Sequence, residues 1–346
     1  MMSKIDMKQA LGKLIEGESL TREEARSVMT TIMEGEATTS QIGALLTALR
    51  IKGETVQEIA GFAEVMREKS IRLNHRLSGV LDTCGTGGSG IHKFNVSTTS
   101  AIICASLGVP VAKHGNRAMS GKSGSADVLE ALGVNIMLTH EQAAACLENI
   151  GICFMFAQNY HPSMKHAAGP RRELGIRTGF NVLGPLTNPA NAEHQLMGIY
   201  DRSKTELIAG VLRELGSRHA LVVGSLDGLD EISICAPTKV SELRNGEIRT
   251  YEIAPEELGL SRHSLEQVMG GEPAHNAKIV REVLGGAQGA YRDIVLINAA
   301  ASLYAADRCE DLREGVQLAA QAIDSGAALR KLQELIDYTG VVSHVS

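Results

Sequence analysis

The chain has 346 residues, of which 40 are acidic and 34 are basic, so its formal net charge is −6. This acidic balance argues against a protein dedicated to binding nucleic acid or a membrane surface. Hydrophobic residues make up 44% of the sequence and charged residues 21%, which excludes a disordered or fibrous chain. The six cysteines form no C-x-x-C pair and the first residues form no signal peptide, so we expect reduced thiols in a cytoplasmic protein without a membrane span.

Residues 1 to about 70 carry the pattern of amphipathic helices. Leu11, Leu14 and Ile15 recur at helical spacing. The sequence predicts about four helices here, with Gly53 ending one of them. Three starts fit the capping box, in which Glu or Gln follows a threonine by three positions: Thr21 with Glu24, Thr38 with Gln41, and Thr55 with Glu58.

From Val80 onward, short apolar runs end in glycine loops and lead into helices, which is typical of a mainly parallel sheet. Alternation around Lys239–Ile253 predicts a hairpin that turns at Asn245 and Gly246. Ile294–Tyr304 is apolar almost all round and predicts a buried helix. The predicted strands lie near Val80–Asp82, Val109–Ala112, Val134–Ile136 and Ala220–Val223, and the predicted helices near Ser97–Leu107, Ser125–Leu132, Glu141–Ile150 and Thr205–Leu215.

A glycine-rich loop, from Asp82 to Gly90, follows the first predicted strand. Its main-chain N–H groups can converge on an anion, and the helix start from Asn95 to Thr98 adds hydroxyls and a positive dipole end. The loop therefore predicts a cradle for phosphate or pyrophosphate. It also fits the G-x-G-x-x-G pattern of dinucleotide-binding folds, but the next predicted strand ends in Lys113 instead of an acidic residue. A glycine turn that binds no ligand is the simpler alternative.

A second loop, from Lys113 to Ser125, carries three fixed cations among serines and glycines. It follows the next predicted strand, so we expect a second anion site beside the first. Gly121-Lys122-Ser123 looks like the end of a P-loop, but five residues separate Gly115 from Gly121 where that motif has four. A nucleoside triphosphatase is therefore rejected, and a solvated basic loop is the alternative.

Acidic residues follow the predicted strand Ala220–Val223, at Asp227, Asp230 and Glu231. Adjacent carboxylates at a strand end suit a hard cation such as Mg²⁺, whose coordination substrate phosphates complete. A plain surface turn would explain the same residues.

The segment from His161 to Asn181 is basic. Because a planar guanidinium can bind a carboxylate through two hydrogen bonds, Arg171 or Arg172 is a candidate to hold an acidic co-substrate. A helix with solvated arginines is the alternative. The double-proline segment from Gly184 to Pro189 predicts a hinge or a crossing between domains.

Taken together, these residues resemble the anthranilate phosphoribosyltransferase family, which joins anthranilate to phosphoribosyl pyrophosphate in tryptophan biosynthesis. The resemblance runs essentially end to end through DTCGTGG, NVST, KHGNRAMS, SGSADVLEALGV, HPSMKHAAGPRRELGIRTGFNVLGPLTNPA and DGLDE. It implies a small all-helical domain packed on a larger α/β domain with a mainly parallel sheet, as in nucleoside phosphorylases, and a homodimer formed through the helical domain. We place the helical domain at residues 1–72, joined by helices from about 162–190, and the α/β domain at 78–346.

The resemblance also implies which residues hold the two substrates and Mg²⁺. Arg171 would bind the anthranilate carboxylate, with Asn116 and Gly85 nearby. Mg²⁺ would be held by Ser97, Asp230 and Glu231. The residues expected along phosphoribosyl pyrophosphate are Gly85, Gly88, Asn95, Ser97, Thr98, Lys113, Asn116, Ser120 and Ser125, and the other expected members of the substrate site are Thr86, Gly87, Ser89, Lys93, Val96, His114, Gly115, Arg117 and Gly121.

Two positions depart from the family pattern. Ser89 stands where the glycine loop usually carries an acid, and Gly121 stands where a second serine is usual. The loss of the acid removes a negative charge close to the expected metal and pyrophosphate. Gly121 loses a hydroxyl but keeps its N–H group, which is a smaller change.

The implied reaction is attack of the anthranilate amine on the anomeric carbon while pyrophosphate leaves. Such a reaction needs a clamp on the leaving group more than a covalent nucleophile, and an aromatic amine needs no strong base. His114 is a candidate proton acceptor, with a structural role equally open. The alternatives are an enzyme like pyrimidine nucleoside phosphorylase, which lacks KHGNR combined with DGLDE, and a non-catalytic paralogue that binds nucleic acid, which the acidic balance opposes.

Overall fold

The computed structural model describes residues 5–118 and 121–342, and its first part is a helical domain. The three capping boxes predicted at Thr21, Thr38 and Thr55 are confirmed, because each threonine hydroxyl accepts a hydrogen bond from the N–H three residues on. Gly53 ends the third helix with a φ of 90°, as predicted. The helices of this part are α1 (Met7–Ile15), α2 (Arg22–Met33), α3 (Thr39–Lys52) and α4 (Val56–Lys69).

The remaining chain builds an α/β domain around one sheet. The strand order is β3-β2-β1-β4-β5-β6-β7. The first five strands in this order are parallel to one another, whereas β6 pairs antiparallel with β5 and β7 pairs antiparallel with β6. The predicted mainly parallel sheet is therefore confirmed, and so is the hairpin that turns at Asn245 and Gly246. The strands are β1 (Leu81–Gly85), β2 (Val111–Gly115), β3 (Ile152–Phe156), β4 (His194–Gly198), β5 (His219–Ser225), β6 (Thr238–Arg244) and β7 (Glu247–Ile253).

The helices predicted in this part are present within one or two residues of their expected bounds. The apolar segment around Ile294–Tyr304 lies in a helix that is buried on nearly every side. The helices are α5 (Val96–Ser106), α6 (Ser125–Leu132), α7 (His140–Ile150), α8 (Ala157–Tyr160), α9 (Lys165–Leu174), α10 (Phe180–Leu186), α11 (Thr205–Glu214), α12 (Pro273–Leu284), α13 (Ala290–Ala305), α14 (Leu312–Asp324) and α15 (Ala327–Val342).

One predicted strand is wrong and two strands were not predicted. Val134–Ile136 forms no strand, because it links α6 to α7 and the Asn135 N–H donates to the Thr339 hydroxyl on α15 instead of to a neighbouring strand. Val134 and Ile136 are apolar because they are buried in the core. The strands that the sequence analysis missed are β3 and β4.

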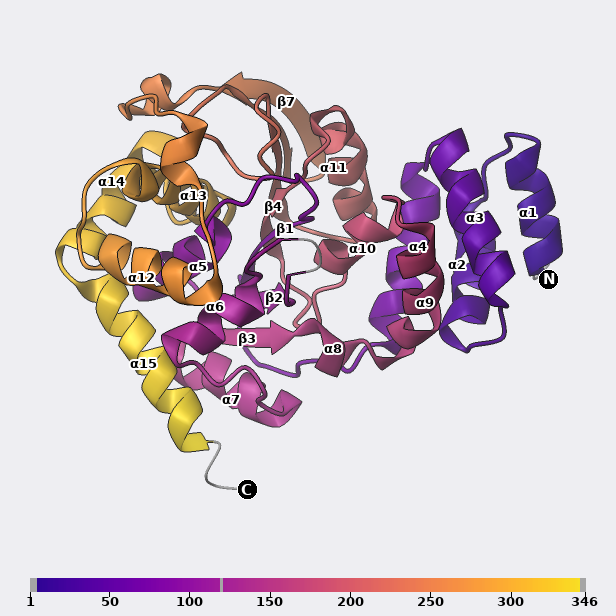
Figure 1. The fold of residues 1–346 in the computed structure, drawn as a ribbon, viewed down its shortest axis with the longest axis horizontal. Coiled ribbons are helices and arrows are strands. Elements are labelled where there is room, and N and C mark those ends of the chain that lie inside the picture. The colour runs from indigo at the N-terminus through magenta and orange to yellow at the C-terminus, as the bar shows by residue number, and fades with distance from the viewer. Residues whose placement is uncertain (1–4, 119–120, 343–346) are drawn as a thin grey trace.

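Helices cover both faces of the sheet. Leu221 and Val223 of β5 point to the face covered by α5 and α13, while Ala220 and Val222 point to the face covered by α11. Figure 1 shows the sheet between these two layers. The core is therefore divided into two parts, one on each side of the sheet.

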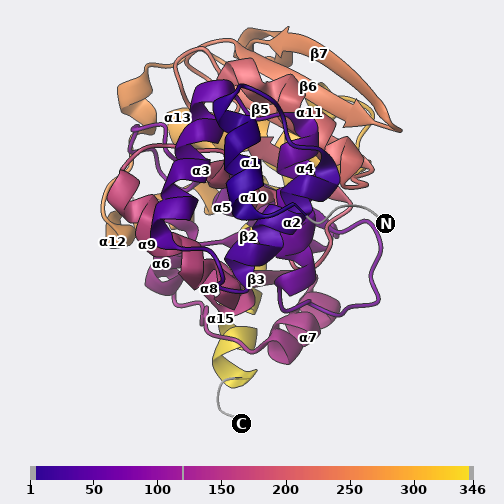
Figure 2. The same ribbon diagram turned by 90° about the vertical axis from the view of Figure 1, so that its right-hand side faces the viewer.

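The helical domain packs on the α11 side of the sheet. Phe180 and Leu183 of α10 share the core of α1–α4, and α9 contacts α2 and α3. α10 lies between the sheet and α4, and in the view of Figure 2 the helices α1–α4 stand in front of the sheet. Two segments far apart in the sequence thus make one helical layer.

The six cysteines are all free thiols, and all but Cys235 are buried, as predicted. Among the described residues, no helix is long and apolar enough to cross a membrane.

Candidate active site

The glycine loop lies at the carboxyl end of β1, where the order of the strands changes direction. β1 sits between β2 and β4, so the loops after these strands open on opposite sides of a crevice. Crevices at such points are the usual ligand sites of parallel sheets. The predicted loops and the acidic pair all belong to this edge.

The glycine loop presents free N–H groups. Gly87, Gly88 and Gly90 have positive φ angles of 63°, 80° and 76°, which only glycine adopts readily. The Gly87 N–H donates to Asp230 Oδ2 over 2.9 Å, but the N–H groups of residues 88–90 have no hydrogen-bond partner within the described part of the chain. An anion can accept these hydrogen bonds, as the sequence predicts.

The start of α5 adds two more free donors. The N–H groups of Ser97 and Thr98 have no hydrogen-bond partner among the described residues, and the Thr98 hydroxyl is buried without one. The Asn95 side chain does not cap the helix, because it bonds to Ser123 and Asn276 instead. The positive end of the helix is therefore open to an anion.

Asp230 and Glu231 follow β5 and are almost completely buried, at 2% and 3% exposure. The Lys93 ammonium donates to Asp230 Oδ1 over 2.7 Å and to Glu231 Oε1 over 2.8 Å. Burial raises the pKa of Glu231, whereas the two carboxylates raise the pKa of Lys93 against its own desolvation. A buried cation and two anions thus stabilise one another beside the glycine loop.

Close packing brings Asp230 to this position. A Cβ atom on Gly85 would lie 2.6 Å from Asp230 Oδ2, and a Cβ on Gly198, at the end of β4, would overlap the Asp230 carbonyl oxygen. Gly198 was not predicted as part of the site because β4 itself was missed.

Lys113 lies in the middle of β2, and its side chain reaches the start of α5. Its Nζ donates to the Thr83 carbonyl oxygen and to the Ser97 hydroxyl, the latter over 3.2 Å. Burial lowers its pKa, while buried Asp82 acts in the opposite direction. The ammonium therefore lies close to the free N–H groups of α5.

The second predicted loop folds back on α6. The Ser125 hydroxyl donates to the Asn116 carbonyl oxygen over 3.3 Å, and Gly115 leaves room for this hydroxyl. Arg117 is exposed and pairs with Asp127 and Glu130. Gly121 is exposed as well, and Ser120 lies outside the described residues.

Arg171 lies on α9, on the side of the helical layer. Its half-buried guanidinium has no hydrogen bond or ion pair among the residues described, and burial lowers its pKa. A carboxylate from outside the chain would satisfy it. Arg172, beside it, is exposed.

His114 and His161 form a neutral pair with ring centroids 5.0 Å apart. Burial lowers the pKa of His114 to about 3 and that of His161 to about 4. Nε2 of each ring is buried and has no hydrogen-bond partner in the described part of the chain. So low a pKa makes His114 a poor proton acceptor at neutral pH, which favours its structural role.

Arg177 was not predicted as a site residue, although it lies against the glycine loop. Its Nε is 3.2 Å from the position that a Cβ atom would take on Gly88, and its guanidinium stacks on the Tyr200 ring 4.3 Å away. It has no carboxylate partner in the described residues. Its place in a basic segment was the signal available in the sequence.

Known proteins share both parts of this architecture. Residues 8–70 match the helical bundle domain of a glycosyl transferase family, and residues 77–329 match the a/b domain of such a family. The anthranilate phosphoribosyltransferase of Symbiobacterium thermophilum is 56% identical over 333 residues, which are 96% of this chain and 98% of that protein.

Two solved structures are similar over nearly their whole length. The anthranilate phosphoribosyltransferase of Thermus thermophilus superimposes with a TM-score of 0.91 at 42% identity, covering 95% of this chain and 99% of that one. The enzyme of Saccharomyces cerevisiae in complex with phosphoribosyl pyrophosphate and Mg has a TM-score of 0.89 at 27% identity, covering 97% and 98%.

Proposed function

The chain belongs to the anthranilate phosphoribosyltransferase family, and we propose that the loops at the carboxyl ends of β1, β2 and β5 bind its substrates. The enzyme transfers the phosphoribosyl group of phosphoribosyl pyrophosphate to the amine of anthranilate in tryptophan biosynthesis. The products are N-(5-phosphoribosyl)anthranilate and pyrophosphate. Family membership decides against the nucleoside phosphorylase and the non-catalytic paralogue.

The pyrophosphate belongs in the cradle between the glycine loop and α5. The free N–H groups of residues 88–90 and of Ser97 and Thr98 supply donors, and Lys113 supplies a positive charge. As pyrophosphate leaves, negative charge grows on its oxygens, and donors that are already in position stabilise it without reorganising. This set of unused donors is the observation that supports the assignment most strongly.

The residues present fit Mg²⁺. Asp230, Glu231 and the Ser97 hydroxyl offer the oxygen ligands that this ion prefers, and the Asp230 carboxylate accepts a hydrogen bond from Gly87 of the glycine loop. Because the Lys93 ammonium already pairs with both carboxylates, a divalent cation must compete with it. When bound, Mg²⁺ would offset the charge of the pyrophosphate.

Anthranilate binds from the side of the helical layer in this proposal. The unpaired Arg171 guanidinium would hold its carboxylate, and the unpaired nitrogens of His114 and His161 can bond a polar group of a bound ligand. Because burial lowers the pKa of His114 to about 3 and that of His161 to about 4, both rings are weak bases and neither is expected to take the proton of the attacking amine. An aromatic amine is already a neutral nucleophile at pH 7, and its proton can pass to water.

Arg177 joins this proposal as a further contact on the glycine loop. Its guanidinium lies over Gly88, next to the free N–H groups, and the Tyr200 ring holds it there. An unpaired positive charge in this place suits the pyrophosphate.

Release of pyrophosphate tests the reaction and the clamp together. The wild type should release pyrophosphate only when phosphoribosyl pyrophosphate and anthranilate are both present. Lys113→Gln should lower the turnover strongly, because its buried ammonium lies at the start of α5. Lys122→Gln, an exposed lysine of the second loop, is the matched control and should be as active as the wild type. Equal activity of the two variants would contradict the role of Lys113.

We also propose a cytoplasmic homodimer formed through the helical domain. Ile15 and Ile51, on α1 and α3, are 74% and 81% exposed, which favours a covered surface in the assembly. Six free thiols suit a reducing compartment. Sedimentation should give a dimer for the wild type and a monomer for Ile51→Glu.

A further inference from the structure

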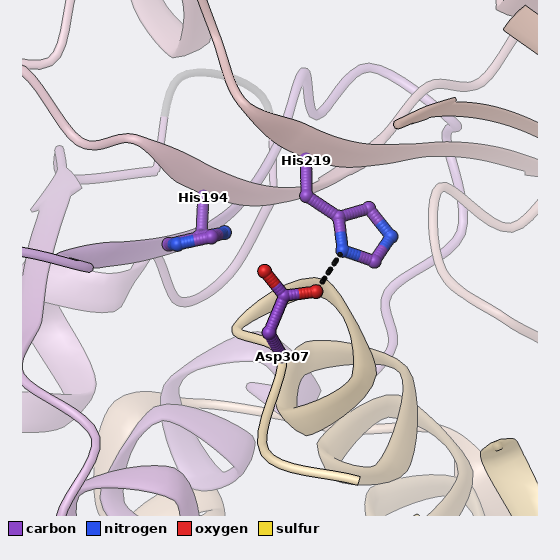
Figure 3. A group of neighbouring side chains, drawn as sticks. All are labelled: His194, His219 and Asp307. Atoms are coloured by element: carbon purple, nitrogen blue, oxygen red, sulfur yellow. Dashed lines mark hydrogen bonds and ion pairs between the residues drawn. The ribbon is translucent and has the colours of Figure 1, made fainter. Parts of the chain in front are cut away.

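Two histidines and an aspartate form a cluster at the edge of the sheet opposite to the glycine loop. His194 begins β4, His219 begins β5, and the two residues pair in register. Asp307 follows α13. Since β4 spans five residues, the cluster lies roughly 13 Å from the end of this strand at the active site. Figure 3 shows the carboxylate of Asp307 between the two rings.

The three side chains have the spacing of metal ligands. One donor atom from each lies within 4.8 Å of the other two. His219 Nδ1 is 3.0 Å from Asp307 Oδ1, and the two rings are tilted by 71° with centroids 6.5 Å apart. An ion at 2.0–2.2 Å from its ligands holds the donor atoms about 3–3.5 Å apart, so small side-chain movements would bring these three donor atoms to coordination distance of one ion.

Both histidines of the cluster are buried. His194 and His219 are 2% and 1% exposed, and His194 Nδ1 has no hydrogen-bond partner among residues 5–118 and 121–342. A buried nitrogen without a partner costs free energy unless something else satisfies it, and a bound metal ion would do so.

Groups around the cluster orient the rings. His194 makes a hydrogen bond to the Ala305 backbone, and because Nδ1 is unpaired this bond engages Nε2. His219 Nε2 lies 3.3 Å from Glu242 Oε1. Metal-binding histidines commonly have such a carbonyl or carboxylate on their second nitrogen. Asp307 has a φ of 54°, a conformation that aspartate tolerates better than most residues.

Two arginines also face the cluster. Arg244 lies 3.4 Å and Arg218 3.9 Å from the Asp307 carboxylate, so they balance the charges of Asp307 and Glu242. Their side chains are 46% and 64% exposed, and water screens their repulsion of a cation. With no excess negative charge, the cluster offers little to Mg²⁺, and its two imidazoles select an ion that prefers nitrogen.

We propose that His194, His219 and Asp307 form a binding site for a divalent transition metal, best matched by Zn²⁺, that is separate from the active site. For Nδ1 of His219 to bind the metal, the single proton of its neutral ring must lie on Nε2, where Glu242 Oε1, 3.3 Å away, can accept a hydrogen bond from it. The ion would tie the starts of β4 and β5 to the end of α13, and water would complete its coordination.

Metal titration of the whole protein tests this proposal. Chelator-treated protein is titrated with Zn²⁺ by calorimetry, and with Co²⁺ while the visible absorption of the ion is recorded. Asp307→Asn keeps a residue that tolerates positive φ, and His194→Gln is the second variant. His263→Gln is the matched control, because His263 also contacts an aspartate, at 2.8 Å from Asp293, but belongs to no group of three possible ligands among the described residues.

The wild type and His263→Gln should each bind one more equivalent of Zn²⁺ than the two cluster variants, whose affinity should fall about 100-fold or more. Any Zn²⁺ that binds at Asp230 and Glu231 does so in all four proteins, so it does not affect the difference in stoichiometry between them. Zn²⁺ should raise the Tm of the wild type and the control but not that of the cluster variants. Equal Zn²⁺ stoichiometry in all four proteins, or Co²⁺ absorption bands unchanged in Asp307→Asn, would overturn the proposal. The three side chains would then be a structural hydrogen-bonded cluster that binds no metal.

Discussion

In our proposal, Arg171 is the residue on which recognition of anthranilate depends most. Its guanidinium is half-buried and unpaired within the described residues, so its removal leaves no partner stranded. Arg171→Ala should raise the KM for anthranilate by about 10–100-fold, because a charge-assisted hydrogen bond contributes about 1.5–3 kcal/mol. Steady-state kinetics with each substrate varied in turn would measure this. Arg172→Ala, which removes the exposed neighbour, is the control and should change the KM for anthranilate little. If Arg171→Ala weakened only the binding of phosphoribosyl pyrophosphate, the assignment would be wrong.

We expect residue 89 to determine how strongly the binding of phosphoribosyl pyrophosphate depends on Mg²⁺. Its hydroxyl accepts a hydrogen bond from the Ile91 N–H over 3.2 Å, a bond that an aspartate at this position can also accept. Ser89→Asp adds a negative charge beside the pyrophosphate, and opposite charges 4 Å apart interact by about 4 kcal/mol at an effective dielectric of 20. The variant should therefore bind phosphoribosyl pyrophosphate with a stronger dependence on Mg²⁺ than the wild type.

Calorimetric titration of phosphoribosyl pyrophosphate at several Mg²⁺ concentrations would compare the two proteins. Ser89→Asn, similar in shape to aspartate but neutral, separates charge from size and should behave like the wild type. If the metal dependence of Ser89→Asp matched that of the wild type, residue 89 would not sense the metal.

At the scale of elements, sequence patterns complete within a few residues predicted helix starts reliably, whereas strands whose composition depends on tertiary contacts were missed. The capping boxes at Thr21, Thr38 and Thr55 predicted helix starts to the residue, because each box is complete within four residues. β3 was missed because ICFMF is apolar throughout and has no strand alternation. β4 was missed because His194 and Gln195 look like loop residues, although the sheet buries both. The polarity of β4 reflects specific contacts that only the folded chain provides.

Gly198 shows what the missed strand contributes to the site. A Cβ atom there would overlap the Asp230 carbonyl oxygen, so Gly198→Ala must push the acidic pair away from the glycine loop. We expect a fall in kcat/KM for phosphoribosyl pyrophosphate and a loss of stability of about 1–3 kcal/mol. Gly43→Ala, inside α3 where a Cβ meets no atom within 4 Å, is the control and should leave kcat/KM unchanged while stabilising the protein by about 0.5–1 kcal/mol. Full activity of Gly198→Ala would show that the acidic pair tolerates displacement.

At the scale of the whole molecule, sequence motifs indicated the parts of the site but not how they meet. The two loops and the acidic pair each follow a strand, and parallel strands bring them to one edge of the sheet. That Lys93 would lie between Asp230 and Glu231, or Arg177 over Gly88, depends on contacts across more than 80 residues of sequence. Such contacts leave no periodic signal. The domain limits at residues 72 and 78 and the roles of the site residues stay predictions.

The buried histidines should make the stability of the molecule sensitive to mild acid. Burial lowers the pKa of His161 to about 4, whereas an unfolded histidine has a pKa near 6.5. Between these pH values the unfolded chain binds a proton that the folded protein does not. Lowering the pH by one unit therefore reduces the free energy of unfolding by about 1.4 kcal/mol for this residue. Urea unfolding between pH 6 and 4.5 should show that the free energy of unfolding depends less steeply on pH in His161→Gln than in the wild type. His140→Gln, which removes an exposed histidine, should keep the slope of the wild type. Parallel slopes for all three proteins would mean that His161 titrates normally and that the interior around it admits water.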